Sequence, residues 1–233
     1  MVRTLERPDS LAARIGADDR RDGLGLALLA EIDRACVDKD ACARLGERGD
    51  RLVFIARGSM KLVAHASGRR DQIVAFQFAG DLVCVPARSA HAYSLVALEP
   101  CRIEAIEYET LIDRCQGDAG IMGRLLSATR ISLARCREKS IGLGRKTAPE
   151  RVATFLLSMA ERIGRHTEDG VELDLPMSRR DIAESLGLTI ETVSRQFTLL
   201  REDGLVATTG RSGVTLCDPA RLAARAGFLE VGP

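Results

Sequence analysis

The sequence predicts an α+β fold with a β-rich front part, a long connecting helix and a mostly helical rear part. Short β-rich runs separated by Gly, Asp and Pro fill residues 50–108. Apolar side chains then recur at alternating steps of four and three residues along 122–143. Two short amphipathic segments and a hairpin pattern follow within 178–216. We therefore expect three regions: 1–116, 117–146 and 147–233.

Composition narrows the class of protein. The 233 residues are 45% hydrophobic and 29% charged, which is typical of a globular chain with room for two domains. The net charge is only +1, so no overall excess of positive charge indicates a nucleic-acid or membrane partner. Aromatics make up 3%, with no Trp, which argues against stacking of single-stranded bases.

The cysteine content and the first residues predict a location. The seven cysteines are an odd number scattered along the chain, which favours reduced thiols over a disulfide framework. Residues 1–23 are studded with Arg and Asp, unlike a signal peptide, and no apolar run approaches the length of a membrane span. We expect a cytoplasmic protein with no membrane partner.

The front part is predicted to be a short helix followed by a small antiparallel barrel or roll. Residues 24–36 carry apolar side chains at helical spacing, namely Leu24, Leu28, Leu29 and Ile32. The runs 52–85 and 93–108 are β-rich. Tight turns are expected at Gly58, Gly68 and Gly80-Asp81.

A long helix is predicted after Gly117, with Asp118 capping its free amides. Its heptad seam consists of Met122, Leu126, Thr129, Leu133, Cys136, Ser140 and Leu143. Such a seam suits pairing with an identical helix, although Thr129 and Ser140 are polar. The alternative is a helix packed on its own β domain.

A second helix is predicted to follow a break at Gly142 and Gly144. Thr147 and Glu150 form a capping box at its start. Its buried face is expected to consist of Val152, Phe155, Leu156 and Met159.

Residues 178–200 show the pattern of two short helices joined by a tight turn. Ser178 is expected to cap the first helix with Asp181, and Gly187 to end it. Thr189 can cap the second, whose apolar stripe is Ile190, Val193, Phe197 and Leu200. This is the helix-turn-helix pattern, in which the second helix lies in the major groove of DNA.

The opposite face of that second helix carries Glu191, Ser194 and Arg195, within a span of roughly 100°. Arg can donate two hydrogen bonds to guanine, a carboxylate can accept from cytosine, and Ser can do either. Glu191 and Arg195 can also brace one another across one helical turn. A plain surface salt bridge is the alternative reading.

A hairpin directly after these helices supports the DNA reading. Residues 204–207 and 213–216 flank Thr209-Gly210-Arg211-Ser212, which predicts a wing with Arg211 near a phosphate backbone. Residues 145–218 contain ten Lys/Arg and twelve Asp/Glu, a net charge of −2. Phosphate contacts would therefore depend on a few placed residues, with a shallow salt dependence. The residues that we predict to contact the DNA backbone are Ser178, Arg179, Arg180, Thr189, Thr192 and Arg211.

With these residues, the chain resembles the CRP/FNR family of bacterial transcription regulators. The matching segments are 53–63, 76–83, 108–111 and, most specifically, 177–206. The resemblance covers nearly all of 50–218. It implies a cyclic-nucleotide-binding-type β jelly roll, a long dimerisation helix and a winged helix-turn-helix. A member of this family would bind a palindromic operator as a homodimer and recruit RNA polymerase.

Residues 190–195, IETVSR, resemble the E-x-x-S-R recognition motif of the FNR/FixK branch. In the cyclic-AMP-responsive branch an Arg precedes the Glu and a Gly replaces the Ser. The resemblance therefore implies a half-site close to TTGAT, with an inverted copy about one helical turn away. It also implies redox, oxygen or nitrogen-oxide responsive control.

The signal is less defined. The family's cyclic-nucleotide site needs a Gly-Glu pair that residues 80–85 lack, so we interpret Arg88-Ser89 as loop residues. An iron–sulfur cluster needs four thiolates. Cys36 and Cys42 keep one family spacing, but Glu104 stands where the distant cysteine is expected, three residues from Cys101. A regulator active without effector or cofactor, as in the FixK group, is therefore the leading expectation.

Other sensors stay open. Cys36, Cys42 and Cys115 are candidates for a redox-active thiol, and His65 and His91 for haem ligation. We expect Cys84, Cys101, Cys136 and Cys217 to be small buried apolar residues.

Two other classes of function remain as alternatives. An enzyme is not expected, because residues 142–147 lack the Gly-Lys pair and preceding strand of a phosphate loop. The three histidines are far apart, so neither a metal site nor a catalytic triad is expected. A winged domain that binds protein rather than DNA is the second alternative, which a gel shift would separate.

Overall fold

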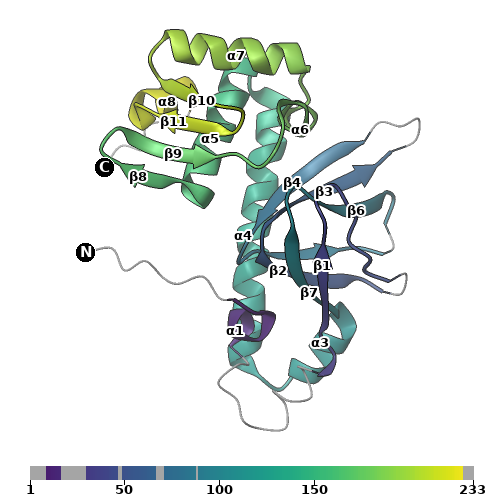
Figure 1. Cartoon of the computed structure of the whole chain (residues 1–233). Coiled ribbons are helices and arrows are strands. Elements are labelled where there is room, and N and C mark those ends of the chain that lie inside the picture. Colours follow the sequence, from purple (N-terminus) through teal and green to yellow (C-terminus); the bar gives the residue numbers. More distant parts are fainter. Residues whose placement is uncertain (1–8, 17–29, 47–48, 67–70, 88, 228–233) are drawn as a thin grey trace. The chain divides into compact units, whose positions relative to one another are not determined.

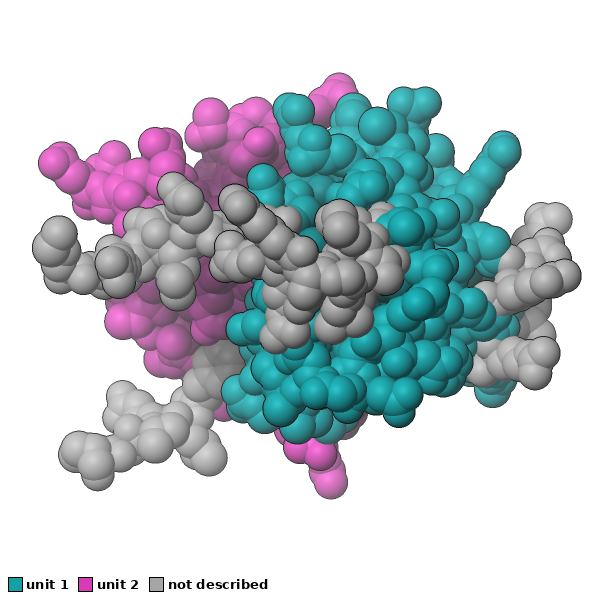
Figure 2. Space-filling view, turned by 90° about the horizontal axis from the view of Figure 1, so that it is seen from below, with its two compact units in different colours: residues 1–133 teal, residues 134–233 magenta. Residues whose placement is uncertain are grey.

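The computed structural model describes residues 9–16, 30–46, 49–66, 71–87 and 89–227. The chain divides into two compact units, residues 1–133 and 134–233 (Figure 2). Each unit has its own core and is described by itself. Within the described part of the chain, no helix is long and apolar enough to cross a membrane.

Unit 1 is built on two antiparallel sheets (Figure 1). The four-stranded sheet has the order β1-β7-β2-β5, formed by Asp33–Val37, Cys101–Glu107, Arg51–Arg57 and Leu82–Val85. The three-stranded sheet has the order β4-β3-β6, formed by Gln72–Phe78, Ser59–His65 and Ala92–Ala97. The crossovers between the sheets are those of a jelly roll, which confirms the predicted fold class.

Strand β2 shows why the four-stranded sheet is buried on both faces. Its side chains alternate between faces, as the period of two requires. Val53 and Ile55 belong to the core that includes residues of both sheets. Leu52 and Phe54 belong to a second core, which includes residues of the helices of unit 1.

Three helices among the described residues of unit 1 contribute to that second core. They are α1 (Leu11–Ile15), α3 (Tyr108–Cys115) and the first turns of α4 (Ala119–Arg145). The buried carboxylate of Glu104 accepts from the backbone N–H of Leu11 at 2.7 Å and from Nε of Arg34 at 3.0 Å. At the other end of α1, Nε of Arg124 donates to the carbonyl of Ile15 at 2.6 Å. Glu104, which stands where the family's distant cysteine ligand is expected, thus holds α1 in place.

The helix predicted for residues 24–36 is wrong over its last part. Leu24, Leu28 and Leu29 lie outside the described residues, as does Gly68. Residues 33–37 form strand β1, which pairs antiparallel with β7 in the register Asp33↔Ala105 to Val37↔Cys101. Pairing with a strand almost 70 residues away overrode the local helical spacing.

Helix α4 is the 27-residue helix that the seam pattern predicted. Asp118 caps it, accepting from the backbone N–H of Ile121 at 2.9 Å. Ile121 is fully buried, and Met122 and Leu125 pack against the same core. Beyond these first turns, the apolar residues of α4 are exposed.

The break predicted at Gly142 and Gly144 is wrong, because α4 continues through both glycines to Arg145. A glycine costs a helix only about 1 kcal/mol relative to alanine, which neighbouring hydrogen bonds can offset. Helix α5 (Ala148–Ile163) then begins at the predicted capping box, in which the Glu150 carboxylate accepts from the Thr147 backbone N–H at 2.7 Å. The four residues of its predicted apolar face are all buried, namely Val152, Phe155, Leu156 and Met159.

Unit 2 is a winged helix-turn-helix on a four-stranded antiparallel sheet of order β10-β11-β9-β8. The predicted wing is the hairpin of β10 (Val206–Thr209) and β11 (Gly213–Leu216). Sequence reasoning missed the second hairpin, β8 (Arg165–Thr167) and β9 (Gly170–Asp174), and also α8 (Pro219–Arg225). Helices α6 (Arg179–Leu186) and α7 (Ile190–Glu202) form the helix-turn-helix (Figure 1).

Candidate nucleic-acid interface

The first helix of the motif, α6, is fixed at both ends by the predicted residues. Ser178 and Asp181 form a reciprocal capping box, in which the Ser178 hydroxyl donates to the carboxylate at 2.6 Å. Gly187 ends the helix at φ +61°, a left-handed conformation that glycine adopts without strain. Ile182 and Ala183 are buried. The turn is therefore short and rigid.

Helix α7 packs on this support through the predicted stripe. Val193, Phe197 and Leu200 are buried, with exposed fractions of at most 5%, while Ile190 is half-buried. Thr189 caps the helix, its hydroxyl accepting from the backbone N–H of Thr192 at 3.2 Å. The stripe holds the helix and leaves its opposite side to solvent.

The three residues predicted to contact bases lie on that open side. Glu191, Ser194 and Arg195 are all exposed, and they project from successive turns near the amino end of α7. The Glu191 carboxyl has a lowered pKa, because its own backbone N–H and the Thr189 hydroxyl hydrogen-bond to it. The face therefore presents an ionised carboxylate, a hydroxyl and a guanidinium to solvent.

The expected brace between Glu191 and Arg195 is not formed. Among the ion pairs of the described residues, none joins these two side chains. The carboxylate instead turns toward the start of its own helix, where amide groups and the helix dipole attract a negative charge. Arg195 is exposed and forms no ion pair with Glu191 among the described residues.

Arg179 has a role that its position in the sequence did not reveal. Its guanidinium carbon lies 3.4 Å from the centre of the Phe197 ring, joining α6 to α7 by a cation–π contact. Burial lowers the pKa of this guanidinium from its ordinary value. The face of the guanidinium is therefore engaged in packing, and only its edge is left to donate to a phosphate.

The other residues predicted to contact phosphate divide into caps and exposed cations. Ser178, Thr189 and Thr192 hydrogen-bond within the helix starts. The first amides of an α-helix have no carbonyl partner within the helix, so helix starts are places where a phosphate can bind. Arg180 and Arg211 are exposed, the latter in the turn of the wing. The structure brings all of them into unit 2.

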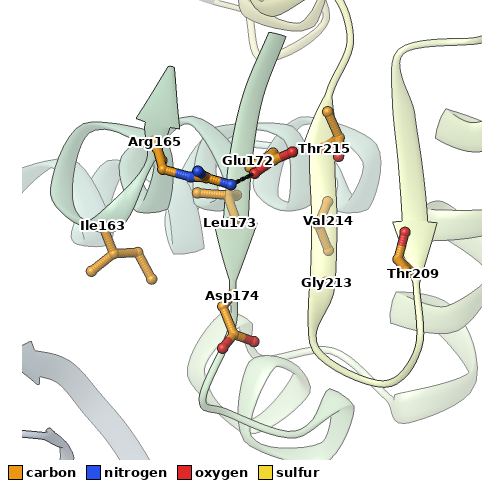
Figure 3. Close-up of a pocket in the computed structure, with 9 residues that line it drawn as sticks. All are labelled: Ile163, Arg165, Glu172, Leu173, Asp174, Thr209, Gly213, Val214 and Thr215. Atoms are coloured by element: carbon orange, nitrogen blue, oxygen red, sulfur yellow. Dashed lines mark hydrogen bonds and ion pairs between the residues drawn. The ribbon is translucent and has the colours of Figure 1, made fainter. Parts of the chain in front are cut away.

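A cavity of about 380 Å³ lies on the sheet of unit 2 (Figure 3). Arg165 and Glu172, which form an ion pair, lie on one side of it, and Thr209 and Val214 on the other. None of the residues predicted to contact DNA lines it. The cavity therefore plays no part in the proposed interface.

The seam of α4 presents apolar side chains to solvent in the single chain. Leu126 is 72% exposed, Leu133 48% and Leu143 36%. Both polar seam residues are satisfied within the helix. The Thr129 hydroxyl donates to the Leu125 carbonyl at 2.9 Å, and the Ser140 hydroxyl to the Cys136 carbonyl at 3.0 Å. The alternative, in which α4 packs on the β domain of its own chain, therefore holds only for the first turns of α4.

The cysteines differ in part from expectation. Cys101 is buried as predicted, whereas Cys84, Cys136 and Cys217 are exposed, so the prediction of burial was wrong for these three. Cys36 and Cys42 are exposed. Cys115 is fully buried in the helix-covered core, which excludes it as an accessible thiol. Although Cys84 is exposed as a residue, part of it is withdrawn from water, and this partial burial and the nearby Asp50 raise the pKa of its thiol.

The candidate haem ligands gain no support from their surroundings. Nδ1 of His65 lies 3.0 Å from Asp71 and Nε2 lies 2.8 Å from Ser94, so both ring nitrogens already have partners. His91 lies in an exposed bend beside Ser89, while Arg88 falls outside the described residues. Among the described residues, no group of three or more His, Cys, Asp or Glu side chains could hold a metal ion.

A jelly roll, a long helix and a winged helix-turn-helix with an exposed polar helix face define a class of DNA-binding transcription regulator. The Crp-like helix-turn-helix domain matches residues 150–225. The nitrogen fixation regulation protein FixK of Azorhizobium caulinodans is 35% identical over 174 residues, which cover 74% of this chain and 70% of FixK. The transcriptional activator protein FnrL of Cereibacter sphaeroides is 34% identical over 186 residues, covering 77% and 75%.

Solved structures agree with these relatives. FixK2 from Bradyrhizobium japonicum superposes with a TM-score of 0.72 at 29% identity, covering 83% of this chain and 96% of FixK2. A CooA mutant from Carboxydothermus hydrogenoformans shares the fold, with a TM-score of 0.74 at 20% identity over 86% of this chain and 90% of CooA. The chain belongs to the CRP/FNR family of transcription regulators.

Proposed function

We propose that the protein binds as a homodimer to a TTGAT-like inverted repeat and recruits RNA polymerase there. The observation that carries this proposal is the exposed face of α7, where Glu191, Ser194 and Arg195 project together. The Phe197 stripe beneath them is buried, so the face has a fixed orientation on the unit.

The chemistry of this face matches the edges of bases in the major groove. Arg195 can donate two hydrogen bonds to O6 and N7 of guanine, and Glu191 can accept from the amino group of cytosine. The Glu191 carboxyl is ionised at neutral pH, as any exposed glutamate is, and can therefore act as an acceptor. A G·C pair within each half-site supplies both partners.

The homodimer is supported by the exposed seam of α4. An exposed leucine stripe of this length is costly in water, and each fully buried leucine contributes about 1.5–3 kcal/mol. A second copy of α4 covers the stripe with side chains of the same kind. A homodimer would present two α7 helices to an inverted repeat, which shares its two-fold symmetry.

The names of two relatives refer to the control of gene expression. FnrL is described as a transcriptional activator and FixK as a regulator of nitrogen fixation. We propose that this protein acts in redox, oxygen or nitrogen-oxide responsive control and binds DNA without a cofactor. Glu104 supports this, because its carboxylate holds α1 and Arg34 where the family's distant cysteine is expected. Anaerobic purification with an absorption spectrum and an iron assay tests it; bound iron or a haem band would contradict it.

Selection from random duplexes tests the proposed operator. The full-length protein should enrich an inverted repeat whose half-sites approach TTGAT, with centres about one helical turn apart. A pool that shows no common motif after several rounds would instead favour the protein-interaction module. A pool enriched in a single, unrepeated half-site would contradict the dimer but keep the readout.

A further inference from the structure

The helix-turn-helix is fastened to the last turns of α4 by one arginine of α5. Arg151 donates from Nε to the Lys146 carbonyl at 2.8 Å and from Nη2 to the Leu143 carbonyl at 2.8 Å. Its third bond runs from Nη1 to the Leu186 carbonyl at 3.0 Å. One guanidinium therefore joins the carboxyl end of α4 to the carboxyl end of α6, within unit 2.

The bonding pattern depends on the shape of the arginine side chain. Guanidinium is planar and carries five N–H donors in a fixed fork, so it can reach three carbonyls at once. The last carbonyls of a helix lack partners within the helix, and the dipole makes that end negative. A cation with three directed donors is therefore stabilised between two helix ends.

A second tether lies beside the first. Nζ of Lys139, on α4, donates to the Ser185 hydroxyl of α6 at 2.9 Å. Lys139 is largely withdrawn from water, and this burial lowers its pKa to about 8. Ser185 is itself buried. The last turn of α6 is thus held to α4 at two successive residues, Ser185 and Leu186.

The turn between α6 and α7 runs close to the same joint. A Cβ placed on Gly187 would lie 3.5 Å from Cδ2 of Leu143 and 3.7 Å from Nη1 of Arg151. The turn that sets the direction of α7 therefore lies against both α4 and the arginine. A shift of the Arg151 side chain would therefore displace the turn that precedes α7.

We propose that Arg151 is a positioning residue that makes the last turns of α4 and the helix-turn-helix, both within unit 2, one rigid piece. In the homodimer, the two α7 helices are then held at one separation and one angle. The protein accordingly rejects inverted repeats whose half-sites have the wrong spacing. This proposal rests on the proposed binding of a homodimer to an inverted repeat. It adds that the Arg151 guanidinium determines which distance between the two half-sites is accepted.

The test compares Arg151→Gln and Arg151→Lys with the wild-type full-length protein. Each binds three duplexes: the TTGAT inverted repeat, and two in which the spacing is changed by about two base pairs, which turns one half-site by roughly 70°. We expect wild type to prefer the correct spacing at least about tenfold, and both variants to lose most of that preference. Affinity for a duplex with a single half-site should change less than about threefold, because α7 keeps its face.

Arg145→Gln is the matched control, because it removes the same charge from the exposed last residue of α4. It should keep the spacing preference. Hydrogen exchange without DNA provides an independent readout. In the Arg151 variants, amides of residues 143–147 and 186–190 should exchange at least about fivefold faster than in wild type and Arg145→Gln.

The outcomes separate the two proposals. Unchanged spacing preference and unchanged exchange in both Arg151 variants would overturn the role of Arg151. A wild-type protein that binds scrambled half-sites equally well would overturn the proposed function, and exchange would still decide whether Arg151 holds the joint. Equal loss of affinity on all duplexes, including the single half-site, would show that Arg151 supports folding of the motif and would contradict the spacing role.

Discussion

Helices α4 and α7 both leave one face uncovered, but the two faces differ in chemistry. The seam face of α4 carries exposed apolar side chains, with Leu126 at 72% and Leu133 at 48%. The face of α7 carries a carboxylate, a hydroxyl and a guanidinium. The first is unfavourable in water until it is covered, whereas the second is well solvated by itself.

This difference indicates two kinds of partner. An apolar stripe at heptad spacing is stabilised when another apolar stripe covers it. A second copy of the same chain provides such a stripe. A polar face on a rigid helix is useful only to a partner that offers matching donors and acceptors. DNA offers these in the major groove. The two helices should therefore respond differently to substitution, one through assembly and the other through sequence preference.

The largest effect should come from the seam. Leu126→Asp with Leu133→Asp places two carboxylates in the apolar contact, so the protein should become monomeric. Because one half-site contact is then lost, operator affinity should fall at least about 100-fold. Sedimentation and anisotropy with the labelled operator measure both. A variant that still sediments as a dimer would contradict the seam. Ser127→Asp with Ala134→Asp, two exposed changes away from the seam on the same helix, serves as the control.

Arg195→Ala should cost about 1–3 kcal/mol on the cognate site and relax base preference at a single position. The reason is the loss of a two-donor contact with no change in the buried stripe. Affinity is measured against every single-base change in the half-site. Glu191→Gln is the companion variant, expected to relax the preference for the same G·C pair, whose cytosine Glu191 is proposed to contact. An unchanged preference profile in Arg195→Ala would remove this residue from readout.

Lys139 gives a prediction about pH. Its pKa in the folded protein is about 8, below the ordinary 10.5, because burial penalises the ammonium. Below pH 8 the amine is protonated in folded and unfolded chains alike, and its burial costs stability. Between pH 8 and 10.5 the folded chain releases this proton first, so the contribution of Lys139 to the free energy of unfolding rises with pH.

Chemical denaturation at pH 7.5 and at pH 9.5 measures this contribution. Wild type should gain on the order of 1–2 kcal/mol relative to Lys139→Met between these two pH values. Lys146→Met, which removes a second amine near the joint, should show the same change in the free energy of unfolding between the two pH values as wild type. A constant difference between wild type and Lys139→Met would contradict the shifted pKa.

The smallest effect separates two adjacent arginines. Arg180→Ala should reduce the slope of log affinity against log salt by about 0.9, the effect of one phosphate contact, with the free energy of unfolding unchanged. Arg179→Ala should in addition destabilise the protein by about 1 kcal/mol, since it removes the contact with Phe197. Equal stability of the two variants would show that the cation–π contact contributes nothing.

Local chemistry was predictable from the sequence, whereas long-range pairing was not. The caps at Asp118, Thr147, Ser178 and Thr189 were predicted correctly, because each depends on a hydroxyl or carboxylate within three residues of the helix start. Strand β1 was mistaken for a helix, since its partner β7 lies almost 70 residues away. The glycines of α4 were overvalued as helix breakers, because a glycine costs a helix only about 1 kcal/mol relative to alanine.

The candidate site was predicted in the same uneven way. Periodicity alone placed Glu191, Ser194 and Arg195 on one exposed face, because a helix has a fixed angle per residue. It could not show that Arg179 packs on Phe197, or that Arg151 bonds to the ends of two other helices. Those contacts depend on how elements pack, and nothing in the local spacing encodes them.

One competition experiment tests the central proposal, that α7 reads base edges. The full-length protein is bound to a labelled TTGAT inverted repeat and challenged with two unlabelled duplexes of equal length and composition. One competitor is identical to the labelled repeat, and the other has both half-sites scrambled. We predict that the scrambled duplex competes at least about 1,000-fold less well at physiological salt. Equal competition by both duplexes would contradict the proposal.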